Sequence, residues 1–295
     1  MSLTAFAPAK INLFLHVGGP ASDGYHPLCS LMVFADIGDR VVLHDAEALS
    51  FRVHGPFAGP LAGQGDNLVL RAAKALLATA RGPQIPVCVS LEKTLPVAAG
   101  LGGGSSDAGA TLRLLRSALD LDLDDAELEQ IASSLGADGA ACLWGRPVLA
   151  QGRGERLSPA PHLPSIDAVL VNPGVEVSTP AVYRALDAAG VFGEVEPPPM
   201  PEAFEDVVEL AAWLGMMRND LEAPAVALAP EVGDVLATLA GEPETLIARM
   251  SGSGATCFAV CPSDIEADAL ADRIARLRPQ WWVRRCRLGG PWPDA

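Results

Sequence analysis

A glycine-rich segment in the first half of the chain has the composition of an anion-binding loop. Residues 96–107 read PVAAGLGGGSSD, with four glycines among the five residues 100–104. Glycine lets the backbone approach a phosphate closely, and a helix N-terminus leaves amide groups unpaired with a partial positive charge. Because a helical pattern begins at Ser106, the segment predicts a phosphate site at a helix start, with hydroxyl groups from Ser105 and Ser106.

This segment matches neither of two common nucleotide-binding patterns. The P-loop pattern requires a lysine that is absent, and the dinucleotide fingerprint fails at Ser105, where its last glycine should stand. A flexible linker is the alternative, but linkers rarely separate an apolar strand from an amphipathic helix. We therefore predict a nucleotide phosphate site of another type, in which Ser106 is a candidate ligand for Mg²⁺.

Two charged side chains stand alone in apolar surroundings. Lys10 lies in a predicted strand at 1–17, and Asn12 shares its face of that strand. The alternative role is that of a strand-edge lysine whose ammonium group reaches water. Asp138 is the only charged residue in the stretch 131–145 and needs either a partner or a shifted pKa, unless it caps the next turn. Both residues are therefore candidates for chemistry.

An aromatic pair, Tyr25 and His26, follows Gly24 in the loop after the first strand. These rings could stack on a planar base, and they could equally pack against their own turn. The residues alone leave both interpretations open.

The elements that must position these groups follow from periodicity and turn residues. Residues 124–135 predict a helix with a capping box formed by Asp124 and Glu127. Strands and helices do not alternate regularly, which favours an α+β fold with largely antiparallel sheets. The predicted strands are 1–17, 28–37, 39–44, 50–54, 86–91, 148–151, 168–172, 247–250, 255–261 and 281–287, and the other helices are 66–80, 106–119, 202–217, 221–228 and 265–277.

The composition of the chain excludes several classes of protein. The 295 residues carry a formal net charge of −15, which argues against nucleic acid and anionic membranes as partners. The six cysteines form no Cys-x-x-Cys pair, so buried reduced thiols are expected. Neither a signal pattern nor an apolar run of about 18 residues is present. We expect a cytoplasmic protein that acts on a small molecule.

Several motifs together resemble the GHMP kinases, named for galactokinase, homoserine kinase, mevalonate kinase and phosphomevalonate kinase. The motifs are PAKINLFLHV at 8–17, DGYHPL at 23–28, GLGGGSSDA at 100–108, LGAD at 135–138 and SGSGATCFAV at 251–260. The resemblance implies a domain at 1–160 like ribosomal protein S5 domain 2, a ferredoxin-like domain at 161–295, and ATP between them. Residues 190–205 carry no recognisable motif.

Within that family, the motifs are most similar to those of members that phosphorylate the 2-hydroxyl of 4-diphosphocytidyl-2-C-methyl-D-erythritol in the non-mevalonate route to isoprenoid precursors. This likeness implies ATP and Mg²⁺ as cofactors, a monomer or weak homodimer, and Lys10 and Asp138 as the catalytic pair. It assigns ATP binding to Pro96, Val97, Ala98, Ala99, Gly100, Leu101, Gly102, Gly103, Gly104, Ser105, Ser106 and Asn67, and substrate binding to Asn12, Tyr25, His26, Thr179, Tyr183 and Arg184.

One departure and two alternatives accompany this resemblance. After Asp138 the family has a β-branched residue, a proline and an aromatic residue, whereas this chain has Gly139, Ala140 and Ala141, which would fill the turn less. Another small-molecule kinase of the family is the nearest alternative, and the segment 23–26 argues against it. A non-catalytic nucleotide-binding protein is the second, but such a protein has no need of both Lys10 and Asp138.

Overall fold

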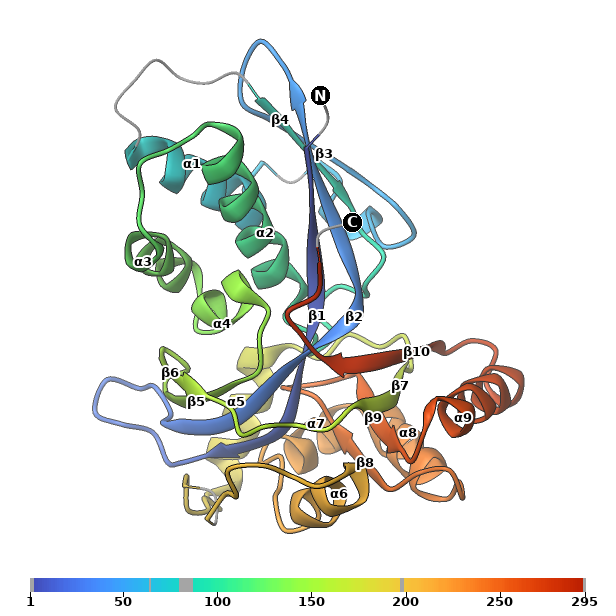
Figure 1. The fold of residues 1–295 in the computed structure, drawn as a ribbon. Coiled ribbons are helices and arrows are strands. Elements are labelled where there is room, and N and C mark those ends of the chain that lie inside the picture. The colour runs from blue at the N-terminus through green and yellow to red at the C-terminus, as the bar shows by residue number, and fades with distance from the viewer. Residues whose placement is uncertain (1–2, 64, 80–86, 197–198, 294–295) are drawn as a thin grey trace.

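The computed structural model of the chain describes residues 3–63, 65–79, 87–196 and 199–293. Two long strands, β1 (Leu3–Val17) and β2 (Leu28–Asp45), form an antiparallel pair that runs through both halves of the molecule (Figure 1). The pattern of residues along these strands explains their position, because nearly every side chain from Ala7 to Val17 is buried. Strands of both halves of the molecule therefore pair with this central strand pair.

β2 is one continuous strand, so the prediction of two strands at 28–37 and 39–44 was wrong. The apparent break, Gly38, pairs with Pro8 of β1 within the ladder. A Cβ atom at Gly38 would lie 2.2 Å from the carbonyl oxygen of Ala7. The glycine therefore permits a close approach between two backbones, which a single sequence cannot distinguish from a turn.

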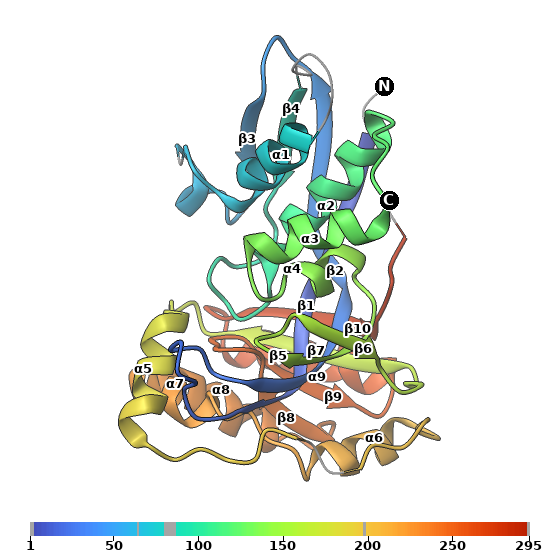
Figure 2. The same cartoon turned by 90° about the vertical axis from the view of Figure 1, so that its left-hand side faces the viewer.

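The first half of the molecule places four helices on one side of the upper part of this strand pair. These helices are α1 (Leu68–Thr79), α2 (Gly103–Ala118), α3 (Asp125–Leu135) and α4 (Gly139–Trp144) (Figures 1 and 2). Of these, α2 is the helix that packs directly on β1 and β2. β4 (Val87–Glu92) pairs with β2, and β3 (Ser50–His54) pairs with β4 in the one parallel ladder among the described strands. A short 3₁₀ turn, η1 (Gly59–Leu61), follows β3. Apolar side chains of α1, α2 and β4 form the core between helices and sheet.

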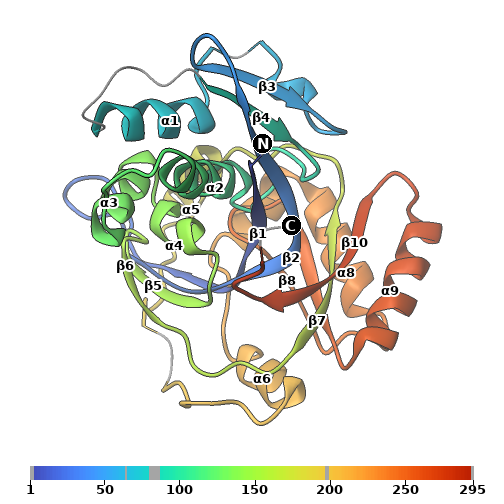
Figure 3. The ribbon, with the colours of Figure 1, turned by 45° about the horizontal axis from the view of Figure 1, so that its top comes forward.

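The second half continues the same sheet and adds five helices. Its strands are β5 (Val148–Gly152), β6 (Arg156–Pro159), β7 (Ile166–Asn172), β8 (Ile247–Met250), β9 (Cys257–Cys261) and β10 (Trp282–Gly289). Its helices are α5 (Thr179–Ala189), α6 (Val207–Leu214), α7 (Glu222–Leu228), α8 (Pro230–Ala240) and α9 (Asp264–Leu277). The sheet order is β3-β4-β2-β10-β7-β9-β8, with β1 and β5 also paired to β2. The last strand therefore joins the first half to the second (Figure 3).

Most predicted elements are present, with shifted ends. The capping box of α3 is confirmed, since Asp124 accepts from the amide of Glu127 and Glu127 accepts from the amide of Asp124. The helix predicted at 202–217 is shorter, because Asp206 caps α6 and begins it at Val207. The predicted ends at Met1, Ala80 and Pro86 lie outside the described residues. The division into domains at residue 160, between β6 and β7, stays a prediction.

Two further expectations concern the cysteines and the membrane. All six cysteines are free and buried, as their spacing predicted. No helix among the described residues is long and apolar enough to cross a membrane.

Candidate active site

A cavity of about 1290 Å³ lies where the two halves meet. Its walls come from β1, the β1–β2 loop, the glycine-rich loop, the α3–α4 junction, α5 and the β8–β9 loop. Single-ligand pockets commonly measure about 300–1,000 Å³, so the cavity has room for two ligands. Of the residues that the sequence singled out, those lining it are Lys10, Asn12, Tyr25, His26, Asp138, Thr179, Tyr183, Arg184 and every residue of 96–105.

The glycine-rich loop (residues 94–106), defined here to include the first turn of α2, follows β4, and its backbone conformation requires glycine at two positions. Gly100 and Gly102 have φ angles of 76° and 60°, in the left-handed region that favours glycine. A Cβ atom at Gly100 would also lie 2.2 Å from the carbonyl oxygen of Ser251. The loop is thus fitted against the β8–β9 loop, whose Ser251 hydroxyl donates to the Gly100 carbonyl at 3.0 Å. Both halves of the molecule therefore contribute to holding this loop.

The N-terminus of α2 is open toward the cavity. Its N-cap is Gly102, which has no side chain to accept from the first amides, and its first turn holds no acidic residue. Gly103, Gly104 and Ser105 all line the cavity. Unpaired amides at the positive end of a helix dipole attract an anion, so this arrangement is suited to a phosphate group.

Lys10 and Asp138 meet at the cavity wall, although they come from β1 and the α3–α4 junction. Lys10 is 4% exposed, which rules out the strand-edge lysine that reaches water. Its Nζ lies 3.1 Å from Asp138 Oδ2 and donates to Asn12 Oδ1 at 2.6 Å. Asn12 in turn donates to Ser30 Oγ at 2.7 Å, which fixes the amide. The ammonium group is thus held in place beside a carboxylate that is one-third exposed to the cavity.

Asp138 does not act as a helix cap. It occupies the residue before α4, but its side chain makes no capping hydrogen bond and pairs with Lys10 instead. The glycine after it has a steric cause, because a Cβ atom at Gly139 would lie 1.9 Å from the carbonyl oxygen of Ala132 in α3. Gly139 therefore allows α4 to approach α3 closely while leaving Asp138 at the cavity wall.

The aromatic residues line another part of the cavity. The ring of His26 lies 5.1 Å from that of Tyr183, measured between centroids, and its Nε2 is 3.2 Å from Asp187 Oδ1 on α5. Burial, with the nearby charge of Asp138, raises the pKa of Tyr183 to about 12, so its hydroxyl stays protonated. Tyr25 is 59% exposed and lies beneath the guanidinium of Arg153, at 4.3 Å. Tyr25 is therefore not simply packed into its own turn.

Two other predicted substrate residues lie on α5. Thr179 and Ser253 are joined by a hydrogen bond of 2.7 Å between their hydroxyl oxygens, which ties α5 to the β8–β9 loop. Arg184, which directly follows Tyr183 on α5, also lines the cavity. Together with Arg153, Arg184 brings positive charge to a cavity in a protein of net negative charge.

Asn67 and Ser106 are absent from the residues that line the cavity. Asn67 accepts from the amide of Leu70 at 3.0 Å at the start of α1, and its neighbour Leu68 lines the cavity instead. Ser106 is fully buried, and its Oγ has no hydrogen-bond partner among the described residues. The same residues contain no group of three or more His, Cys, Asp or Glu arranged to hold a metal ion. The predicted roles of Asn67 toward adenine and of Ser106 toward Mg²⁺ therefore stay predictions.

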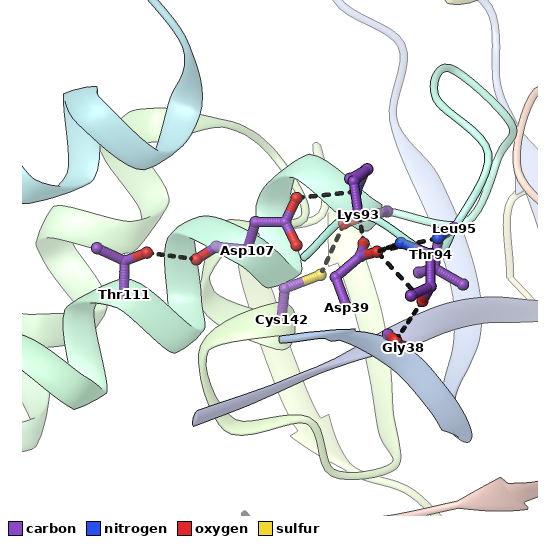
Figure 4. Close-up of polar contacts among 9 residues, drawn as sticks. Gly38, Asp39, Lys93, Thr94, Leu95, Asp107, Thr111 and Cys142 are labelled. Atoms are coloured by element: carbon purple, nitrogen blue, oxygen red, sulfur yellow. Dashed lines mark hydrogen bonds and ion pairs between the residues drawn. The ribbon is translucent and has the colours of Figure 1, made fainter. Parts of the chain in front are cut away.

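Sequence reasoning missed a buried ionic cluster beneath the glycine-rich loop, formed by Lys93, Asp39 and Asp107 (Figure 4). Burial raises the pKa of Asp107 to about 7, although the charge of Lys93 opposes that shift. Burial alone would lower the pKa of Lys93, but Asp107 and Asp39 more than offset it and raise the pKa. The sequence did carry one signal, since the chain has only three lysines and this one directly precedes the loop.

Comparison with known proteins agrees with this geometry. The model of the GHMP kinases N terminal domain matches residues 67–146, and that of the GHMP kinases C terminal domain matches residues 200–279. A 4-diphosphocytidyl-2-C-methyl-D-erythritol kinase from a Caulobacter species is 64% identical over 292 residues, covering 99% of this chain and 100% of the relative. Its counterpart from Caulobacter vibrioides is 62% identical, covering 98% and 100%.

Solved structures show the same likeness. The crystal structure of a 4-(cytidine 5'-diphospho)-2C-methyl-D-erythritol kinase has a TM-score of 0.79 and 35% identity, covering 98% of this chain and 100% of that one. The predicted α+β fold of the family is therefore confirmed. Given the two matching domain models and relatives that align over nearly their whole length, this chain belongs to the GHMP kinase family, within its group of 4-diphosphocytidyl-2-C-methyl-D-erythritol kinases.

Proposed function

We propose that this protein transfers the γ-phosphoryl group of ATP to the 2-hydroxyl of 4-diphosphocytidyl-2-C-methyl-D-erythritol, in the non-mevalonate route to isoprenoid precursors. The observation that carries the proposal is the pairing of Lys10 with Asp138 in a cavity that also includes the open end of α2. The names of the relatives, at 62–64% identity, support the choice of acceptor.

Each part of the cavity fits one requirement of phosphoryl transfer. Asp138 accepts the proton of the acceptor hydroxyl while the hydroxyl oxygen forms a bond to the γ-phosphorus of ATP. The bond from that phosphorus to the bridging β-phosphate oxygen breaks at the same time and releases ADP. Lys10, held by Asn12, orients the hydroxyl and balances the charge that develops on it. The loop amides at the start of α2 bind the phosphates of ATP.

We infer that Mg²⁺ accompanies ATP. When bound, Mg²⁺ neutralises negative charge on the phosphate oxygens, and it commonly takes few ligands from the protein. The unpaired, buried hydroxyl of Ser106, one turn into α2, is the group of this chain that fits such a role.

The aromatic and basic groups fit the cytidylyl end of the acceptor. Tyr25, His26 and Tyr183 offer flat apolar faces for cytosine, and Arg184 offers charge for the diphosphate. We also infer that the protein works as a monomer or weak homodimer in the cytoplasm, where buried thiols stay reduced.

A turnover assay tests the proposal directly. The purified protein is incubated with ATP, Mg²⁺ and 4-diphosphocytidyl-2-C-methyl-D-erythritol, with homoserine and mevalonate as alternative acceptors, and ADP release is measured. Of the three acceptors, we expect only the cytidylyl compound to be phosphorylated. The variant Asp138→Asn should lower kcat by roughly 10²–10⁴-fold, because a positioned general base contributes about that factor.

The exposed residue Asp122 provides a matched control for this variant, since Asp122→Asn changes the same functional group far from the cavity. A near-normal kcat for a folded Asp138→Asn protein would remove Asp138 from the mechanism. Preferential turnover of homoserine or mevalonate would overturn the acceptor.

A further inference from the structure

The buried cluster of Lys93, Asp39 and Asp107 joins the two ends of the glycine-rich loop. Lys93 directly precedes the loop at 94–106, and Asp107 directly follows it. Lys93 Nζ donates to Asp107 Oδ2 at 2.8 Å, so an ion pair closes the base of the loop (Figure 4). Both side chains are almost completely buried and both line the cavity. The separation between the loop's ends is therefore set by this contact.

Asp39 fixes the beginning of the loop to β2. Its Oδ2 accepts from Lys93 Nζ at 2.5 Å, and its Oδ1 accepts from the amides of Thr94 and Leu95 at 2.6 and 2.9 Å. The Thr94 hydroxyl donates to the carbonyl of Gly38 at 2.6 Å. A single carboxylate of β2 thus holds the ammonium group and the first two backbone amides of the loop.

The ammonium group also supports the first turn of α2. A Cβ atom added to Gly103 would lie only 3.0 Å from Lys93 Nζ, so the glycine rests directly on the lysine. Gly103 is the first residue of α2, whose amides are the proposed phosphate ligands. A shift of Lys93 would therefore move the amides that must meet the phosphates.

The shape of lysine suits this place better than that of arginine. An ammonium group is a compact charge with three donors, and here it fits between two carboxylates and beneath a glycine. The chain contains 21 lysines and arginines but only three lysines, Lys10, Lys74 and Lys93. Two of these three are buried beside the cavity, and Lys74 is exposed on α1.

We propose that Lys93 is a positioning residue for ATP, which holds the glycine-rich loop and the first turn of α2 in their phosphate-binding geometry through its ion pairs with Asp39 and Asp107. The identity of ATP as the ligand rests on the proposed function. The residue touches neither reacting atom, and its effect on catalysis passes through the loop.

This role differs from that of an ionic cluster that only stabilises the fold. A stabilising cluster would change the melting temperature and leave the affinities for both substrates alone. A positioning residue would weaken ATP binding selectively, because its loss displaces the amides that bind the phosphates, and misplacement of aligned groups by about 1 Å costs as much as 10²-fold in rate. The comparison of two ligands therefore separates the two roles.

The first test measures binding of a non-hydrolysable ATP analogue by calorimetry to the wild type, Asp107→Asn, Lys93→Met and Lys74→Met. Asp107→Asn keeps an oxygen that can accept from Lys93, so this variant tests the ion pair even if Lys93→Met does not fold. We expect the analogue's Kd to rise roughly tenfold in Asp107→Asn and further in Lys93→Met. Lys74→Met should bind like the wild type.

The kinetic arm uses the same proteins. We expect KM for ATP to rise by about the same factor as Kd, while KM for the acceptor alcohol stays within about twofold. An unchanged analogue Kd in folded Asp107→Asn, or equal rises in both KM values, would overturn the proposal.

A chemical test follows the lysine itself, because three lysines give few signals. Acetylation by an amine-reactive ester, followed by peptide mass spectrometry, should modify Lys74 readily and Lys93 slowly. In Asp107→Asn the rate at Lys93 should rise severalfold, and the ATP analogue should protect it in the wild type. No protection at Lys93 by the analogue would contradict the coupling to the loop. If turnover with the proposed acceptor fails, binding and acetylation still judge this inference separately.

Discussion

Lys10 illustrates how much a side chain's role depends on residues that are distant along the chain. A lysine among apolar residues of one strand has no local counter-ion, and burial of an unpaired ammonium group is costly. The structure supplies Asn12 from the same strand and Asp138 from the α3–α4 junction. The pairing fixes the ammonium group at the cavity wall, so the charge that makes the strand unusual is also the group that meets the acceptor in the proposed mechanism.

Tyr25 gives a prediction at the same scale. Its ring is exposed and is held from one side by Arg153, so removal of the ring should cost little stability. Stacking of a base on an aromatic ring is worth about 1–3 kcal/mol, hence Tyr25→Ala should raise KM for the cytidylyl acceptor roughly 5- to 160-fold. Tyr25→Phe keeps the ring and should retain most of the affinity. Steady-state kinetics that showed an equal rise in KM for ATP would contradict stacking.

Among the site residues, those with a local signature were predictable and those defined by contact were not. The glycine-rich loop is recognisable because its residue types are unusual and contiguous. Lys93 is marked only by its rarity and its place before the loop, and its partners are not local, since Asp39 is separated from it by 54 residues and Asp107 by 14. Its importance depends on three side chains meeting in the interior, which the order of residues does not reveal.

At the scale of elements, α3 depends on its capping box. Asp124 and Glu127 each accept from the other's backbone amide, and these contacts satisfy donors that a helix start leaves unpaired. Asp124→Ala should therefore lower the free energy of unfolding by about 1 kcal/mol. Urea denaturation measures this change, and Asp122→Ala, two residues earlier and exposed, is the matched control. Equal stability of the two variants would show that the cap contributes nothing.

The helices that escaped prediction did so for two different physical reasons. α5 and α8 begin with proline in their first turn, and proline is compatible with that position although it usually indicates a break. α4 has only six residues, Gly-Ala-Ala-Cys-Leu-Trp, and five of them are buried, so packing rather than propensity forms it. Strands β3 and β8, by contrast, have the predicted bounds.

At the scale of the whole molecule, stability should depend on pH through His16. This residue is buried in β1, its Nδ1 lies 3.3 Å from the carbonyl oxygen of Val195, and its Nε2 has no partner among the described residues. Burial, reinforced by the charge of Arg218, lowers its pKa below the ordinary 6.5. Below about pH 6.5 the unfolded chain therefore binds a proton that the folded chain does not, and the free energy of unfolding falls as pH falls.

The size of this contribution has an upper limit of about 1.4 kcal/mol per pH unit, because one proton is involved. His16→Gln should reduce the loss of stability between pH 7.5 and pH 5.5, as measured by urea denaturation at both values. His44→Gln, which changes an exposed histidine on β2, serves as the control. The same loss in His16→Gln as in the wild type would exclude His16 as its source.

The position of β10 between β2 and β7 has a consequence for synthesis on the ribosome. Asp36 of β2 accepts a hydrogen bond from the amide of Arg287, 251 residues later in the chain. At about 5–20 residues per second, β2 emerges roughly 13 to 50 s before its neighbour exists. During that interval Phe34 and Ala35, which lie between the stretches of β2 that pair with β5 and β4, have no partner on that edge, and unpaired strand edges recruit other chains. Closure of this short gap in the sheet is therefore among the last steps in the folding of the nascent protein.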